Sequence, residues 1–237
     1  MTVRHLPTPS VPLSRRRLLE VAAAAFVIGA GACSADRRSS DVLGTTPPAL
    51  GPPTLPELAR AAPSVALVGD SISYLSRDAL ERKLREEGFG EIEFDALPGR
   101  RIAEGDSSGL VVLDYAIAAG LEPALWIVEL GTNDLGNYAG PAAYGELIDL
   151  VLQRIPPPTP VVWVDTYSSF RLAECELFNA TLRTSIEQRE GPAAIAEWYA
   201  KCVEIGPATL IPDGLHPVAD GFSIFAEVTV APVDIVA

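Results

Sequence analysis

Histidine, cysteine and positive charge are all scarce in this sequence. Its 237 residues include 2 histidines and 3 cysteines, and its 31 Asp and Glu residues outnumber its 18 Lys and Arg residues, so the formal net charge is −13. An acidic surface repels phosphate backbones and anionic lipid headgroups. We therefore expect no nucleic-acid partner and no electrostatic docking on a membrane.

Motifs for common cofactors are missing too. The sequence has no glycine-rich phosphate loop and no cluster of His and Cys at metal-ligand spacing. We therefore expect no nucleotide, no catalytic metal and no other cofactor. With 48% hydrophobic and 21% charged residues, the chain has enough apolar material for one well-packed globular domain and some additional segments.

The additional segments lie at the N-terminus, where residues 1–32 are typical of an export signal. An arginine cluster at 15–17 precedes an apolar run, Val21 to Ala32, which is shorter than the roughly 18 residues that a membrane span needs. Ser14 with the paired arginines resembles a twin-arginine signal. Residues 30–33, Ala-Gly-Ala-Cys, resemble a bacterial lipobox, whose cysteine is acylated after cleavage.

We therefore expect an exported lipoprotein that is attached to the outer face of the cell membrane only through a lipid on Cys33. A soluble secreted protein and an uncleaved anchor are the alternatives. Residues 33–60 are rich in Pro, Ser and Thr and show no apolar periodicity, which predicts a flexible tether. The remaining residues, 61–237, form the predicted folded domain.

Apolar runs and helical patterns alternate along this domain. Strands are predicted at 65–68, 92–97, 124–130, 161–164 and 193–198, and helices at 72–87, 110–119, 144–155, 172–188 and from 216 onward. Strict alternation predicts right-handed crossovers between parallel strands. The predicted fold class is therefore α/β, with one parallel sheet and helices on both of its faces.

Two cysteines, Cys175 and Cys202, fall within the predicted domain. In an exported protein an even number of cysteines is typical of disulfide bonding, and a bridge between these two would stabilise the fold by roughly 3 kcal/mol. Two unpaired, buried cysteines are the alternative.

Polar residues stop several of the predicted strands. The stops are Gly69-Asp70-Ser71, Pro98-Gly99, Gly131-Thr132-Asn133-Asp134 and, late in the chain, Asp213-Gly214-Leu215-His216-Pro217. The carboxyl ends of parallel strands meet at one edge of a sheet, which is where ligands bind in open α/β folds. We expect the four stops to converge there.

Ser71 is the candidate nucleophile of this edge. A serine hydroxyl needs a base that takes its proton, and the base needs a third group that orients it. His5 lies in the export signal, so His216 is the one histidine of the domain that can act as the base. Asp213, on the same loop, can orient the imidazole.

Acyl transfer also places negative charge on one oxygen, which needs preorganised hydrogen-bond donors. The Ser71 amide, the Gly99 amide and the Asn133 side chain can supply three of them. A glycine at 99 leaves the backbone open to a ligand, although an ordinary turn glycine is the alternative. Asn133 could instead cap a turn or a helix.

Four charged residues beside these stops are not assigned to the chemistry. Asp70 and Asp134 are expected to bond loop backbone. Arg100 and Arg101 follow Gly99, and we expect them on a solvated face, with contact to an anionic substrate as the alternative.

The four blocks together resemble those of the SGNH hydrolases, also called GDSL-like esterases and lipases, and they cover the domain from about 65 to the C-terminus. The resemblance implies a flavodoxin-like three-layer α/β/α sandwich with about five parallel strands. It also implies Ser71 as nucleophile, His216 as base and Asp213 as its orienting group. Ser71, Gly99 and Asn133 would form the oxyanion hole. The sequence has no Gly-x-Ser-x-Gly elbow at Ser71, which disfavours the ordinary α/β-hydrolase lipases.

The resemblance implies an exported serine esterase that hydrolyses small acyl esters, carried on a polysaccharide or a lipid, through an acyl-enzyme. An O-acyltransferase acting on cell-envelope sugars is one alternative, and a surface binding module without activity is another. The segment Glu197-Trp198-Tyr199 is similar to a segment of bacterial cell-wall O-acetyl enzymes. The acyl chain, the alcohol and the oligomeric state do not follow from the sequence.

Overall fold

The computed structural model describes residues 62–236. The predicted export signal, the lipid-bearing Cys33 and the tether lie outside these residues. Within them, no helix is both long enough and apolar enough to cross a bilayer.

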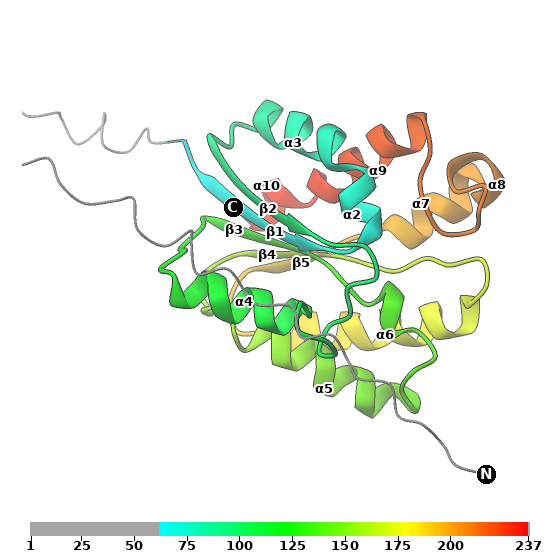
Figure 1. Cartoon of the computed structure of the whole chain (residues 1–237), viewed down its shortest axis with the longest axis horizontal. Helices are drawn as coiled ribbons and strands as arrows, with labels where there is room; N and C mark the ends of the chain where they lie inside the picture. Colours follow the sequence, from blue (N-terminus) through cyan, green and yellow to red (C-terminus); the bar gives the residue numbers. More distant parts are fainter. Residues whose placement is uncertain (1–61, 237) are drawn as a thin grey trace, which may run out of the picture. The chain divides into compact units, whose positions relative to one another are not determined.

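A single parallel sheet organises this part of the chain (Figure 1). Its five strands are β1 (Ser64–Gly69), β2 (Glu91–Ala96), β3 (Leu125–Glu129), β4 (Val161–Val164) and β5 (Ala193–Ala196), in the order β2-β1-β3-β4-β5. This is the order of a flavodoxin-like doubly wound sheet. The strand order reverses between β1 and β3, so the crevice beyond their carboxyl ends is the expected place for a ligand.

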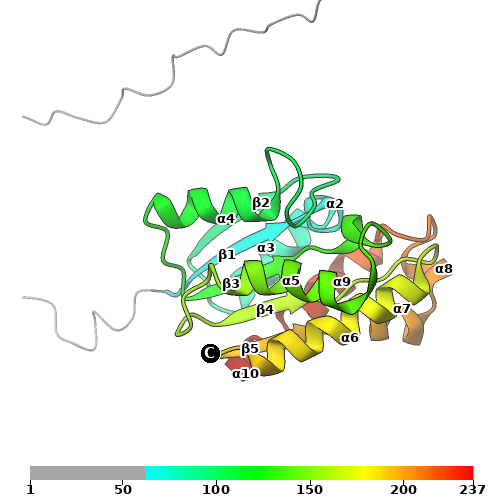
Figure 2. The same ribbon diagram turned by 90° about the horizontal axis from the view of Figure 1, so that it is seen from below.

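Helices cover both faces of the sheet (Figures 1 and 2). One face carries α4 (Gly109–Ala118), α5 (Gly140–Leu152) and α6 (Leu172–Gln188). The other carries α2 (Ser71–Leu75), α3 (Arg77–Glu86), α7 (Trp198–Ile205), α8 (Pro207–Leu210), α9 (Asp220–Val230) and α10 (Val233–Val236). The predicted three-layer α/β/α sandwich with five parallel strands is confirmed.

Alternating side chains of the strands divide the core into two layers. In β1, Val65 and Leu67 belong to the layer under α3 and α9, while Ala66 and Val68 belong to the layer under α4 and α5. Because both faces of β1 are buried, the strand is apolar at every central position. Burial on both faces therefore explains the short apolar run from which this strand was predicted.

The helix predicted after Ser71 is in fact two helices. The chain leaves helical geometry at Ser76, where φ is −91° and ψ is 5°, and α3 begins at the next residue. Ser76 is buried, whereas Leu75, which the helical pattern places inside, is 48% exposed. The bend therefore turns the end of α2 toward solvent, beside the corner that carries Ser71.

The region after β4 departs most from the expected elements. The strand predicted at 193–198 ends at Ala196, and helices α7 and α8 were not predicted. The backbone N–H of Tyr199 in the first turn of α7 donates to the Asp165 carboxylate at 2.7 Å, so a residue remote in sequence caps this helix. The helix predicted from 216 onward begins only at Asp220, as α9, after Pro217 and Ala219 with φ of +45°, and the short helix α10 follows it.

The disulfide predicted between Cys175 and Cys202 is not formed, and both residues are buried free cysteines. The physical reason is their placement in different layers of the core. Cys175 on α6 packs in the layer with α4 and α5, while Cys202 on α7 packs in the layer with α3 and α9. Burial raises the pKa of the Cys175 thiol to about 11, which keeps it protonated and unreactive.

Reductant should therefore leave the stability of the protein unchanged. Loss of a disulfide worth about 3 kcal/mol would lower the melting temperature by roughly 6–12 °C in a domain of this size. We expect the same melting temperature with and without dithiothreitol. In the Cys33→Ser variant, denatured without reductant, iodoacetamide should alkylate both remaining cysteines; a peptide that joins Cys175 to Cys202 would contradict the structure.

Candidate active site

Helix α2 follows β1 at the carboxyl edge of the sheet (Figure 1), and Ser71 lies at the corner between these two elements. Asp70 caps the short helix, since its Oδ1 accepts a hydrogen bond from the Ile72 N–H at 2.9 Å. Ser71 is thus the first residue of α2 and is half-buried. The Ser71 N–H forms no hydrogen bond with any group in residues 62–236, as is usual for the first turn of a helix.

His216 meets Ser71 from a loop between α8 and α9. Its Nε2 lies 3.0 Å from Ser71 Oγ, and its Nδ1 lies 2.8 Å from Asp213 Oδ2. The structure therefore brings together the three residues that the sequence singled out as nucleophile, base and orienting group. This arrangement allows an imidazole to take the hydroxyl proton while a carboxylate fixes its tautomer.

Asp213 is held as a carboxylate by its own loop. Its Oδ1 accepts hydrogen bonds from the backbone N–H groups of His216 at 2.7 Å and Leu215 at 2.9 Å. Desolvation raises the pKa of Asp213, but the hydrogen bonds from the His216 backbone, the His216 ring and the Leu215 backbone together outweigh it, so the pKa lies below its ordinary value. The orienting group is therefore negatively charged at neutral pH.

A second loop supports the histidine loop. The Ser169 N–H donates to Gly214 O at 2.8 Å, and the Gly214 N–H donates to Ile211 O at 2.7 Å. Gly214 has φ of +83°, and an added Cβ would lie 2.8 Å from the ring of Phe170. The backbone conformation therefore favours glycine at 214, and a larger residue there would also have to displace the exposed Phe170 ring.

Gly99 lies in the turn that follows β2. The Arg100 N–H donates to Leu97 O at 3.1 Å, and Gly99 has φ of +77° after Pro98, a combination typical of a type II turn. Nothing lies within 4 Å of a Cβ built on Gly99, so the backbone conformation explains this glycine. Its N–H forms no hydrogen bond within residues 62–236, so it is free to bind a ligand oxygen.

Asn133 reaches the same corner but uses its amide within the protein. Its Nδ2 donates to Asp70 Oδ2 at 2.8 Å and to Arg100 O at 3.1 Å. Since a side-chain amide has two N–H donors, both are engaged in this structure. Ser71 and Gly99 thus present free main-chain donors. The Asn133 side chain connects the residues next to them, Asp70 and Arg100, by its two hydrogen bonds.

Arg100 is not on a solvated face, contrary to expectation. The residue is 5% exposed, and its guanidinium donates hydrogen bonds to main-chain carbonyls and to Asp95. Arg101 is partly exposed and pairs with Glu104 and Asp134. Asp70 and Asp134 do bond main-chain N–H groups, since Asp70 Oδ1 accepts from Ile72 at the start of α2 and Asp134 Oδ2 accepts from Ile102 at 3.0 Å.

Glu129 is a buried residue of the site that was not predicted from the sequence. It is the last residue of β3, and its Oε2 accepts from the N–H groups of Asp70 at 3.0 Å and Ser73 at 3.2 Å. These two amides flank Ser71, so one carboxylate fixes the nucleophile corner from the neighbouring strand. A charged residue at the end of an otherwise apolar strand was the signal in the sequence.

Glu129 and Asp70 form a pair of buried carboxyl groups. Burial raises the pKa of both, and the negative charge of Glu129 raises that of Asp70 further. The folded protein therefore binds protons at this pair more tightly than the unfolded chain does. Its contribution to stability is largest at low pH and falls as pH rises above the ordinary carboxyl pKa.

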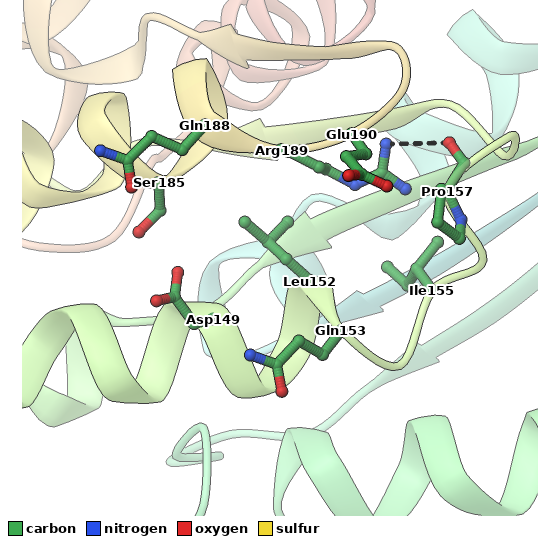
Figure 3. A pocket seen from close by; sticks show the side chains of 9 residues that line it. All are labelled: Asp149, Leu152, Gln153, Ile155, Pro157, Ser185, Gln188, Arg189 and Glu190. Atoms are coloured by element: carbon green, nitrogen blue, oxygen red, sulfur yellow. Dashed lines mark hydrogen bonds between the residues drawn. The ribbon is translucent and has the colours of Figure 1, made fainter.

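The hollow shown in Figure 3 is separate from this site. It has a volume of about 310 Å³ and is lined by residues that precede β4 and β5, which places it at the amino edge of the sheet. The Arg189 guanidinium in this hollow donates hydrogen bonds to the carbonyls of Pro156, Pro157, Thr159 and Pro192. In residues 62–236 no group of three or more metal-ligating side chains occurs.

Replacement of Glu129 should separate its structural role from its charge. Glu129→Ala leaves two buried N–H groups without an acceptor, and we expect it to lower the free energy of unfolding by about 2–4 kcal/mol. Glu129→Gln keeps an acceptor oxygen and removes one ionisable group. Its stability relative to the natural protein should therefore rise from pH 5 to pH 8, as measured by urea unfolding.

The exposed Glu146 on α5 provides the control. Glu146→Gln should show the same pH dependence as the natural protein. If Glu129→Gln also tracks the natural protein at every pH, the raised pKa of the buried pair is wrong.

No protein-family model matches the chain, and no curated protein sequence matches it either. Solved structures do match. The C-terminal catalytic domain of Streptococcus pneumoniae peptidoglycan O-acetyltransferase A has a TM-score of 0.57 and 16% identity, over 74% of this chain and 92% of that one. The Clostridium thermocellum family 3 carbohydrate esterase has a TM-score of 0.55 and 19% identity, over 73% and 96%.

A third solved structure is AlinE4, an SGNH-hydrolase family esterase, with a TM-score of 0.52 and 21% identity over 73% of this chain and 96% of that one. With identities this low, the structural similarity establishes the fold, and the chemistry has to be argued from the residues of the site. The single five-stranded parallel sheet, covered by helices on both faces, is the fold of the SGNH hydrolases.

Proposed function

We propose that the chain is a serine esterase that cleaves carboxylic esters through an acyl-enzyme on Ser71. The observation that carries this proposal is the 3.0 Å contact between Ser71 Oγ and His216 Nε2, in series with the 2.8 Å contact to Asp213. A base at this distance can take the hydroxyl proton directly. The fold shared with SGNH-hydrolase esterases supports the same conclusion.

In the first half of the reaction, Ser71 Oγ bonds to the ester carbonyl carbon as its proton passes to His216 Nε2. The π electrons of the carbonyl move onto its oxygen, which becomes an oxyanion. The Asp213 carboxylate faces the imidazolium formed at this moment and stabilises its charge. Collapse of the intermediate breaks the bond to the alcohol oxygen, which leaves with the proton from Nε2.

In the second half, water replaces the alcohol. His216 Nε2 takes one of its protons as the water oxygen bonds to the acyl carbon. The second intermediate collapses, the Ser71 oxygen recovers its proton from the imidazole, and a carboxylic acid is released. One ester and one water are thereby converted into one acid and one alcohol.

The free main-chain N–H groups of Ser71 and Gly99 are the proposed donors to the oxyanion. Both lie at the carboxyl edge of the sheet, after β1 and β2, where the ester carbonyl meets Ser71. The Asn133 side chain is the proposed third donor. Its Nδ2 would break the hydrogen bond to the Arg100 carbonyl and donate to the oxyanion instead. Donors fixed in advance stabilise this charge without reorganisation.

Small acyl esters on sugars or lipids are the proposed substrates. Two of the similar structures are named for peptidoglycan O-acetylation and for carbohydrate esters, which favours acetylated sugars as the first to test. We further propose that the protein is exported and carries a lipid on Cys33. This location agrees with the proposed substrates, because an enzyme at the cell surface would meet envelope sugars. Both the export and the lipid rest on residues 1–33, which lie outside the described structure.

Replacement of Ser71 should abolish activity without unfolding the protein. We expect Ser71→Ala to lower hydrolysis of p-nitrophenyl acetate by at least about 10³-fold and to prevent labelling by a fluorophosphonate probe. Asp213→Ala should cost up to about 10⁴-fold, because the imidazole loses its orienting group. Ser223→Ala, at a partly exposed serine of α9, is the control that keeps full activity. A natural protein that neither hydrolyses esters nor reacts with the probe would instead be a binding module.

Acyl transfer is the second candidate, because the fold is shared with a peptidoglycan O-acetyltransferase domain. The two functions differ only in whether water or a sugar hydroxyl accepts the acyl group. We expect free acetate as the main product even when chito-oligosaccharides are present as acceptors. Mass spectrometry that finds acetylated oligosaccharide as the main product would make the protein a transferase.

A further inference from the structure

Arg100 is the most extensively bonded side chain near the proposed site. Its Nε donates to Ser107 O at 3.0 Å, its Nη1 to Gly69 O at 3.1 Å and to Asp95 O at 2.7 Å, and its Nη2 to Asp95 Oδ1 at 2.5 Å. Only 3% of the side chain is exposed. We call Arg100 with these acceptors the Arg100 clamp.

The clamp connects each segment that carries a proposed oxyanion donor. Gly69 is the last residue of β1, directly before Asp70 and Ser71, and its carbonyl is bound by the guanidinium. Gly99 precedes Arg100 in the turn after β2. The third connection is made by the Arg100 main chain, whose carbonyl accepts from the Asn133 amide.

The clamp requires the shape of an arginine. Four hydrogen bonds leave a planar guanidinium toward acceptors on three separate segments, at the ends of β1 and β2 and in the loop at Ser107. A lysine ammonium is a single point with three donors and cannot reach this set. Asp95 supplies the opposite charge that a buried guanidinium needs.

This geometry also decides between two roles for Arg100. An arginine that binds an anionic substrate presents its donors to solvent, whereas here the guanidinium points inward to protein oxygens. Its effect on the reaction must therefore be exerted through the residues that it holds.

We propose that Arg100 is a positioning residue for the reaction, holding the Gly99 turn against the end of β1 so that the Gly99 and Ser71 amides face the same ester oxygen. This inference rests on the proposed esterase function. It adds a side chain that touches no substrate and still determines how well the oxyanion is stabilised.

Arg100→Lys is the variant that tests the clamp. Removal of one oxyanion-hole donor from a serine protease lowers kcat by about 10²- to 10³-fold, and misplacement of a donor should cost less than its removal. We expect kcat for p-nitrophenyl acetate to fall about 10- to 100-fold, with KM within about 3-fold of the natural value. The rate of Ser71 labelling by a fluorophosphonate should fall in parallel, since that reaction also places charge on an oxygen in the same hole.

The pair formed by Arg154 and Asp114 provides a matched control. Arg154 Nε lies 2.8 Å from Asp114 Oδ1, and the pair joins the turn after α5 to α4, away from the site. Arg154→Lys should leave kcat, KM and the labelling rate within about 2-fold. Arg100→Lys with a lower melting temperature and an unchanged kcat per titrated active site would show a merely structural role and overturn the proposal.

Asp95→Asn keeps the experiment decisive if Arg100→Lys does not fold. It retains Arg100 and weakens one bond of the clamp, so kcat should fall by a smaller factor, about 2- to 10-fold, at unchanged KM. A folded Asp95→Asn variant with natural kcat and labelling rate would overturn the inference. If the natural protein itself shows neither hydrolysis nor labelling, the proposed esterase function is wrong. That result differs from failure of the Arg100 proposal, in which the natural protein is active and the Arg100 variant is equally active.

Discussion

The parallel pairing of β1 with both of its neighbours is the constraint on which the site depends. Gly69 at the end of β1 stands opposite Ala96 of β2 and Glu129 of β3. Since the three strands stop at one level, the segments that follow them emerge together and bring Ser71, Gly99 and Asn133 to one edge. His216 arrives separately, from a loop 145 residues after Ser71.

Two buried charges hold that edge by opposite means. Glu129 accepts hydrogen bonds from main-chain N–H groups around Ser71, and Arg100 donates hydrogen bonds to main-chain carbonyls around the Gly99 turn. Burial of a charge is costly unless hydrogen bonds compensate for it, and a well-packed apolar core would stabilise the fold as well. The charges are therefore better explained by the precision that they give to the two loops than by stability.

Patterns in the sequence predicted those features whose causes are local. The strand at Val161–Val164 and the helix at Leu172–Gln188 were predicted to the residue, because their apolar periods are uninterrupted. Helix α7 was missed, since its cap is Asp165, 34 positions before Tyr199. Arg100 was misplaced because its four acceptors come from segments that only the folded chain assembles.

The juxtaposition of Ser71, His216 and Asp213 followed from residue types, although their distances could only come from the structure. The sequence could identify the single histidine of the domain and the aspartate on its loop. It could not show that both N–H donors of Asn133 are used by Asp70 and Arg100, nor that Cys175 and Cys202 lie in different layers. Such facts depend on packing between segments, which no local pattern records.

The exposed ring of Phe170 links the surroundings of the site to its histidine. The ring is 76% exposed yet lies against Gly214, and the adjacent Ser169 N–H is bonded to the Gly214 carbonyl. The segment that bears Phe170 and the loop that bears the imidazole are therefore tied to each other by a main-chain hydrogen bond. An apolar ring thus stands in solvent beside the only segment of the described residues that supplies a histidine.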